Sequence, residues 1–354
     1  MFHSKGTLVT CGDAGVLPAL WIDLDLATPA DAGERASTDI LRASEEARAA
    51  CPVPVLSNPI VVADASVPGR AYTVWNAVTF GRYPQTEILP GAVEDALPSQ
   101  EIDAELFRQL DEAADGDEAT VEATRYVRLD GRWFRCAPIV WRVLEVSGDT
   151  ALLLADRGLD CVPWHGAYSP VFWEDSDLRG WLNGTAPEAA EGSPYAAPSF
   201  IDSAFTEQER RAIAVSNVAN ASNYYFGTAC GSGTHDRVFL LSEAEVFSSD
   251  TAVKYGFRPS DAVGDPGRRL APTAYALARG AWRSDLPETE GHGFWLLRTN
   301  GYTRDNAVYV GEKGFLYNRG IPVACADATL VPARRVRLGS APIEQVEDIS
   351  SVGK

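Results

Sequence analysis

The chain has 354 residues, of which 45% are hydrophobic. This apolar content is enough for one large core or two moderate ones, and it argues against wholesale disorder. Its 49 acidic and 31 basic residues give a net charge of −18, which opposes non-specific binding to nucleic acid or to an anionic membrane surface. No apolar run approaches the roughly 20 residues of a membrane helix, and the N-terminus lacks the charged-then-apolar pattern of a signal peptide. We therefore expect no nucleic-acid partner and no direct membrane insertion. The chain as it stands is expected to be cytoplasmic, or part of a larger exported protein.

Six cysteines are scattered along the chain, namely Cys11, Cys51, Cys136, Cys161, Cys230 and Cys325. They form no Cys-x-x-Cys pair and have no histidine at metal-ligand spacing. A zinc site is therefore not expected, and the sequence predicts no metal and no cofactor. The even count would permit disulfides, but a long chain with so few cysteines favours small buried thiols.

Residues 1–26 resemble the C-terminal part of the chain. Lys5 and Gly6 precede a predicted strand at 16–24, and Lys313 and Gly314 precede one at 330–338; both strands carry a Pro-Ala step. A lone strand cannot satisfy its backbone groups. We therefore expect residues 1–26 to be a terminal strand, either the remnant of an upstream copy of the domain or an addition to the main sheet. Residues 27–70 predict a linker with a short helix at about 38–50.

The main domain is predicted at 71–340, with a tail at 341–354. Its first strand, residues 78–85, is expected to end at Pro84. Residues 87–122 contain twelve acidic residues and one basic residue, and Ile102, Leu106 and Leu110 recur every four residues from a start near Ser99. This pattern predicts an acidic helical insertion with a narrow apolar stripe. The acidity indicates a solvated face rather than a calcium site, because the tight loop of such sites is missing.

An antiparallel meander follows the insertion. Residues 126–129 and 133–136 flank Asp130 and Gly131, a strong hairpin signal, and residues 139–146 and 151–154 flank a second polar turn. Short helices come next, each with a start signal. The helices are predicted after Asp175–Asp177, after Thr206 with Glu209, after Ser242 with Glu245, and at 273–279. Strands are predicted at 238–241, 294–298, 307–310 and after Ala328. Strands at both ends with small helices and long loops between them fit an α+β domain whose terminal strands pair.

Five motifs in this order resemble a bacterial domain family of unknown function, numbered 6273. They are Phe80–Gln85, Trp141–Leu144, Ser176–Asn183, Asp236–Ser242 and Trp295–Arg298. The resemblance extends from about 78 to 338. The family's usual ending, similar to Gly-Val-Arg-Pro-Ala-Leu-Trp, is matched better by residues 15–21 than by residues 329–335.

The closing layout, a Trp-Leu-Arg strand, a loop, a hairpin and a final Pro-Ala strand, also resembles the C-type-lectin-like fold of formylglycine-generating enzymes and of variable proteins of diversity-generating retroelements. This resemblance implies a C-type-lectin-like α+β fold and says little about activity. The Glu-Pro-Asn or Gln-Pro-Asp and Trp-Asn-Asp motifs of calcium-dependent lectins are missing, and Cys230 lies 95 residues before Cys325, so the close cysteine pair of those enzymes is missing too.

His235 and Asp236 near Cys230 could form a nucleophile, base and carboxylate arrangement. A turn or capping role is the preferred interpretation, because Asp236 belongs to a motif at the start of a strand. No catalytic residue is therefore predicted, and we expect a protein that is not an enzyme.

The best candidate surface is the stretch 298–319 with the loop around 223, because Tyr, Asn and Arg are favoured in adaptable binding loops. The predicted ligand-binding residues are Arg298, Asn300, Tyr302, Arg304, Asp305, Asn306, Tyr309, Tyr317, Asn318 and Arg319, with Asn223 and Tyr224. These residues predict a non-enzymatic recognition module for a protein or glycan ligand. Two alternatives stay open at this point: a structural repeat of a larger envelope or phage-like protein, and a variable protein of a diversity-generating retroelement.

Overall fold

The computed structural model describes residues 55–65, 71–93, 97–187, 189, 192–196, 198–247, 249–258 and 264–351. By its contacts the chain divides into two units, and the elements below belong to the larger one, residues 56–341 and 345–354, apart from the first residue of the last strand. The strand predicted within residues 1–26 and the helix predicted at 38–50 lie outside the described residues. Part of the predicted linker is described, and there Ile60–Ala63 forms strand β1, which pairs antiparallel with β2.

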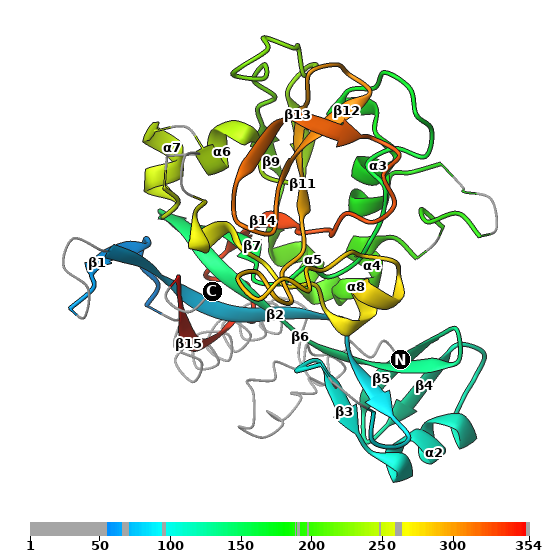
Figure 1. The fold of residues 1–354 in the computed structure, drawn as a ribbon. Coiled ribbons are helices and arrows are strands. Elements are labelled where there is room, and N and C mark those ends of the chain that lie inside the picture. Colours follow the sequence, from blue (N-terminus) through cyan, green and yellow to red (C-terminus); the bar gives the residue numbers. More distant parts are fainter. Residues whose placement is uncertain are drawn as a thin grey trace, which may run out of the picture. The chain divides into compact units, whose positions relative to one another are not determined.

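Two long antiparallel strands, β2 (Ala71–Leu89) and β6 (Arg132–Ser147), are the spine of the main sheet (Figure 1). The sheet has the order β1-β2-β6-β7-β14-β8, with β3 and β15 pairing with β2, and with β5 joining β6 to β4. Its remaining strands are β3 (Gln100–Ile102), β4 (Glu118–Val121), β5 (Thr124–Leu129), β7 (Thr150–Ala155), β8 (Ile213–Ala214), β14 (Ala333–Arg337) and β15 (Glu344–Ser350). The short pairing of β2 with β3 is parallel, whereas β2 pairs antiparallel with β1 and with β6.

Both hairpin turns predicted from the sequence are confirmed. Asp130 and Gly131 adopt φ angles of 49° and 75° and connect β5 to β6, as a two-residue turn with left-handed residues requires. Gly148, with φ of 59°, lies in the turn between β6 and β7. The two strands predicted at 133–136 and 139–146 are one continuous strand, β6.

Pro84 does not end the first strand, so that prediction is wrong. β2 continues to Leu89, and its register with β6 shifts between Pro84 and Thr86. A proline is tolerated at such a bulge, because the missing N–H would not complete a regular ladder bond there. A second register shift follows Thr79 and includes Gly81, whose φ is +72°.

The acidic insertion is built around a single helix, α2 (Ala104–Glu112), which begins after the capping side chain of Asp103 rather than near Ser99. Ile102 is not on this helix but in β3, which pairs with β2. The apolar stripe is shorter than predicted, and buried Leu110 belongs to a cluster with Trp133. The insertion is therefore α+β rather than helical, because strands β3 and β4 find partners in the main sheet.

The core around the spine contains several large aromatic side chains among aliphatic ones. Trp75, Trp133 and Trp141 are fully buried, and each indole N–H donates a hydrogen bond, to the Tyr255 carbonyl, to Asp111 and to the Phe80 carbonyl respectively. A buried tryptophan usually finds such an acceptor, because an unpaired buried N–H is costly. The tryptophan-rich composition thus supplies much of the core of this unit.

The second half of the unit contains the short helices and two small sheets. The helices are α3 (Asp177–Asn183), α4 (Phe200–Ala204), α5 (Glu207–Ala212), α6 (Glu243–Phe247), α7 (Ser249–Lys254) and α8 (Ala274–Ala278), with single 3-10 turns at Trp173–Asp175 and Pro266–Arg268. The sheets are β9 (Ser216–Val218) with β10 (Thr234–Asp236), and β11 (Trp295–Asn300), β12 (Asn306–Val310) and β13 (Leu316–Pro322). Figure 1 shows β11–β13 in orange beside the green and yellow helices.

The predicted helix starts are confirmed with small shifts. Ser176, rather than an aspartate, caps α3, and Gly184 ends it in the left-handed conformation. Thr206 and Glu209 form a complete capping box. Residues 238–241 do not form the predicted strand; Phe239 makes only an isolated bridge to Ala333.

The C-terminal residues return to the main sheet. β14 lies between β7 and β8, and the residues expected to be a tail include β15, which pairs with β2. Ser351 accepts a hydrogen bond from the backbone N–H of Thr73 at 2.9 Å. The described unit is thus an α+β fold of mainly antiparallel strands in which the first long strand pairs with the last. None of its described helices is long and apolar enough to cross a membrane.

Candidate binding surface

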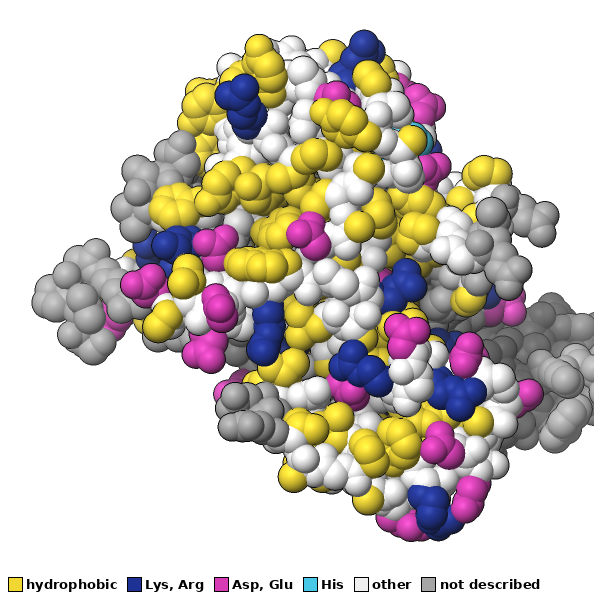
Figure 2. Space-filling view, turned by 45° about the vertical axis from the view of Figure 1, so that its right-hand side comes forward, with side chains coloured by type: hydrophobic (Ala, Val, Ile, Leu, Met, Phe, Trp, Pro, Cys, Tyr) yellow, Lys and Arg dark blue, Asp and Glu magenta, His cyan; other side chains and the backbone are white. Residues whose placement is uncertain are grey.

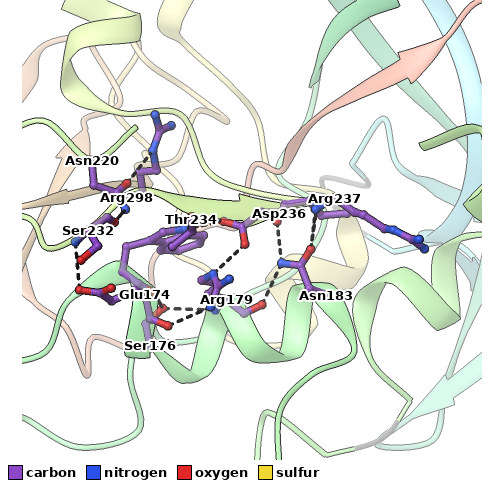
Figure 3. Close-up of polar contacts among 12 residues, drawn as sticks. Glu174, Ser176, Arg179, Asn183, Asn220, Ser232, Thr234, Asp236, Arg237 and Arg298 are labelled. Carbon is purple, nitrogen blue, oxygen red and sulfur yellow. Dashed lines mark hydrogen bonds and ion pairs between the residues drawn. The ribbon is translucent and has the colours of Figure 1, made fainter. Parts of the chain in front are cut away.

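A buried carboxylate, Asp236, joins helix α3 to strand β10 (Figure 3). It accepts hydrogen bonds from Trp173 Nε1 at 3.0 Å, from Arg179 Nε at 2.7 Å and from the Thr234 hydroxyl at 2.6 Å. Its neighbour His235 has an exposed side chain. The Asp236 carboxylate is therefore occupied with structural partners, but it lies in strand β10 and bonds side chains rather than forming the expected turn or cap.

Asn183, the last residue of α3, ties this helix to the following segment. Its side-chain N–H donates to the Arg179 and Val238 carbonyls at 3.0 and 2.8 Å, and its oxygen accepts from the N–H groups of Arg237 and Val238. One side chain thus satisfies backbone groups that no regular ladder would reach. Two of the sequence motifs, Ser176–Asn183 and Asp236–Ser242, are therefore parts of one hydrogen-bonded junction.

Arg298 is predicted to contact ligand, but its side chain is only 3% exposed. It donates to the Leu240 and Ala219 carbonyls at 2.6 and 2.9 Å, and it forms an ion pair with Glu245. It also donates to Asn220 Oδ1 at 3.2 Å (Figure 3). Arg298 therefore supports the loops from beneath, because a buried guanidinium needs this many acceptors.

Two predicted asparagines are buried as well. Asn223 donates to the carbonyls of Asn300 and Asn318 at 3.0 Å each, and Asn300 donates to the carbonyls of Val171 and Arg304 at 2.9 and 3.0 Å. Asn223 and Asn300 are 1% and 0% exposed, so neither reaches a ligand at the surface. Their amides tie the loop of Asn223 to strands β11 and β13, and tie β11 to the loops of Val171 and Arg304, which fixes these loops in one arrangement.

Aromatic side chains are exposed on the loops that this framework supports. Their exposed fractions are 63% for Tyr168, 77% for Tyr224, 53% for Tyr225, 43% for Phe226 and 52% for Tyr302. Phe226 and Tyr302 meet edge to face with centroids 5.0 Å apart, although 76 positions separate them in the chain. We call these five residues, together with Arg304 and Arg319, the loop face.

Two arginines lie over rings at the loop face. The guanidinium of Arg319 is 5.1 Å from the Tyr302 ring centroid, and that of Arg304 is 5.2 Å from Phe172. A guanidinium over an aromatic face is held by the ring's electron density and keeps N–H groups available to a partner. Both arginine side chains are exposed.

The remaining predicted residues have varied positions. Asp305 and Asn306 are half-buried and bonded to one another and to Thr303, and the Thr303 hydroxyl lowers the pKa of Asp305. A hydrogen bond to Asp305 raises the pKa of Tyr168. Asn318 is half-buried. Tyr309 and Tyr317 are on the strands β12 and β13, where they pair across the sheet and stack at 4.6 Å.

Three residues of the loop face, Tyr168, Tyr225 and Phe226, were not among the predicted ligand-binding residues. Phe226 directly continues the pair Tyr224 and Tyr225, and this run of three aromatic residues in a loop was the available signal. Tyr168 had no such signal, because only its position beside Asp305 brings it to the loop face.

The family model of a domain of unknown function, DUF6273, matches residues 148–326, about half of the chain. This range contains the junction of α3 with β10 and the whole loop face. The chain belongs to this family. The matched range is narrower than the 78–338 expected from the motifs, and the insertion precedes it. No curated protein and no solved structure matches the chain.

The described cysteines of the DUF6273 region and its surroundings are free thiols. Burial is the main cause that raises the pKa of Cys136 and Cys230, and it raises that of Cys161 to about 12 and that of Cys325 to about 11. A protonated thiol is a poor nucleophile and a poor metal ligand. Among the described residues no group of three His, Cys, Asp or Glu side chains is placed to hold a metal ion.

A cavity of about 230 Å³, which was not predicted from the sequence, lies at the edge of the DUF6273 region. Its polar lining includes Tyr83, Asp160, Tyr275 and Arg279, and Tyr83 donates to Asp160 at 2.5 Å while Arg279 donates to the same carboxylate at 3.1 Å. Burial raises the pKa of both phenols. The hydroxyls therefore stay protonated, and the Asp160 carboxylate forms an ion pair with Arg279.

Proposed function

We propose that this protein is a recognition module that binds a protein or glycan through the loop face, and that its fold is C-type-lectin-like. The observation that carries the proposal is the set of five exposed aromatic side chains on loops fixed from beneath by Asn223, Asn300 and Arg298. The strand β11, the hairpin β12 and β13 and the closing strand β14 support the fold part of the proposal.

Exposed aromatic rings favour binding for two reasons. Each ring offers a large contact area with only two side-chain torsions to restrict, so little conformational entropy is lost when a partner covers it. A loop that is already fixed loses little further entropy on association. The buried amides of Asn223 and Asn300 provide that fixation, since Asn223 bonds to strands 77 and 95 residues further along the chain and Asn300 bonds to the loops of Val171 and Arg304.

The charges of the loop face indicate how a partner would be oriented. Arg304 and Arg319 present N–H donors beside the rings, in a chain whose net charge is −18. Arginine donors suit carboxylates and hydroxyl oxygens of a partner. The expected ligand is therefore a protein segment or glycan that offers oxygen acceptors next to an apolar face.

The test is a binding screen followed by variants. The wild-type protein is screened on an array of immobilised bacterial glycans and against a displayed peptide library, and each hit is measured again with Tyr302→Ser and Arg319→Ala. Binding should weaken about tenfold or more, as for aromatic and arginine hot spots. Leu286→Ser, an exposed apolar residue that is 50% exposed and lies outside the loop face, is the control and should bind as the wild type does.

Two results would overturn the proposal. One is that the Tyr302 and Arg319 variants bind the screened glycans or peptides as tightly as the wild type does. The other is a loss of thermal stability in these variants as large as that of a core variant, because exposed binding residues contribute little to folding.

A further inference from the structure

A groove of about 260 Å³ lies on the three-stranded sheet and is lined by four aromatic rings. Trp282 and Phe294 have centroids 5.9 Å apart, Phe294 and Tyr309 5.6 Å, and Tyr309 and Tyr317 4.6 Å. The rings thus form a continuous series. Trp282 and Tyr317 are 41% and 40% exposed, while Phe294 and Tyr309 are half-buried.

The polar part of this groove is acidic. Its remaining lining residues are Glu312, Ile321 and Asp327, so the groove has two carboxylates and no lysine or arginine. Neither carboxylate has an ion-pair partner among the described residues. Figure 2 shows hydrophobic side chains gathered across the face of the molecule that carries β12 and β13, with acidic side chains set among them.

The two phenols of the groove stay neutral. Burial, the neighbouring phenol and the Glu312 carboxylate raise the pKa of Tyr309 to about 12, and burial and Glu312 raise that of Tyr317. Neutral rings keep a negative π face, which attracts cations. Rings and carboxylates therefore favour the same sign of charge in a ligand.

We propose that this groove binds a quaternary ammonium group, such as the trimethylammonium end of choline or of a trimethylated lysine. Aromatic surroundings are the typical site for such a cation, because its methyl groups contact the rings while its charge interacts with their π faces. Glu312 and Asp327 add attraction at longer range. A primary ammonium is a weaker candidate, since its strong hydration is lost in the groove.

The groove is separate from the loop face, and the inference holds whether or not the loop face binds a partner. Only Tyr309 and Tyr317 were predicted as binding residues from the sequence. Trp282, Phe294 and the two carboxylates join them because the segments 282–294 and 312–327 fold against the same sheet.

The experiment is isothermal titration calorimetry of the wild-type protein with choline and with 3,3-dimethyl-1-butanol, the neutral molecule of the same shape. Choline should bind, and the neutral isostere should bind about fivefold or more weakly, because it lacks the cation–π attraction. Tyr317→Leu removes an exposed ring and Glu312→Gln removes one carboxylate. Each should weaken choline binding about fivefold.

Tyr224→Ala, at the loop face, is the matched control and should bind choline as the wild type does. Failure of the loop-face proposal would leave these results unchanged, so the two proposals are tested independently. The inference is overturned if choline gives no heat of binding, if the isostere binds equally well, or if Tyr317→Leu and Glu312→Gln bind choline unchanged. Binding of methyl glucoside in place of choline would assign the groove to a sugar and would also overturn it.

Discussion

Replacement of Asp236 by alanine should destabilise the protein more than any surface change. The substitution leaves Trp173 Nε1, the Thr234 hydroxyl and Arg179 Nε without their acceptor in a buried place. Two neutral hydrogen bonds and one charged hydrogen bond of this kind are together worth about 3–5 kcal/mol. The lower half of that range is expected, because the Arg179 side chain is 25% exposed and keeps its bond to the Glu174 carbonyl.

Thermal unfolding followed by circular dichroism measures the effect. A loss of this size should lower the melting temperature by roughly 6–15 °C in a unit of this length. Asp236→Asn keeps an acceptor oxygen and should fall between the wild type and Asp236→Ala. His235→Ala, an exposed neighbour on the same strand, should change the melting temperature little. Equal melting temperatures for Asp236→Ala and His235→Ala would refute the structural role of this carboxylate.

Three further predictions concern single positions. Burial raises the pKa of Glu243, so its contribution to stability is complete below the ordinary carboxyl pKa and is lost as the pH rises through the folded-state pKa. The difference in unfolding free energy between Glu243→Gln and the wild type, measured by urea titration, should therefore shift in favour of the variant from about pH 4 to about pH 8. The same difference at both pH values would contradict this prediction. Gly320 has φ of +78°, and a Cβ there would lie 2.6 Å from the Ala307 carbonyl oxygen. Gly320→Ala should therefore lower the free energy of unfolding by about 2 kcal/mol or more. Gly91→Ala, where a Cβ meets no atom within 4 Å, is the control and should lower it hardly at all. Arg334 is fully buried, and its guanidinium lies 3.7–4.3 Å from three ring centroids. Lysine has no flat group to stack on these rings, so Arg334→Lys should lose about 1–3 kcal/mol of stability in thermal unfolding. An unchanged melting temperature would exclude this stacking role.

Features that depend on neighbouring residues could be predicted from the sequence. The turn at Asp130 and Gly131 and the capping box of Thr206 with Glu209 follow from short-range backbone preferences, and each was found where expected. The α+β class also followed, because the pattern of strands and short helices is local.

Features that depend on distant partners were predicted less well. The sequence indicated that the polar residues at 298–319 and near 223 belong together, but not which of them point outward. Asn223 and Asn300 have the composition of binding residues, yet they are buried because distant loop carbonyls need donors. In the insertion, Ile102 was assigned to a helix by spacing, although β2 offers its backbone a strand to pair with.

By itself, the sequence determined the turns, the helix caps, the aromatic and acidic composition and membership of the DUF6273 family. Only the tertiary structure decided which side chains reach the surface. Burial is set by long-range packing and by the need to satisfy every buried polar group, and neither is visible in local spacing. For that reason Tyr302 and Phe226 meet on one loop face, and Trp282 joins Tyr317 in one groove, although long stretches of chain separate the members of each pair.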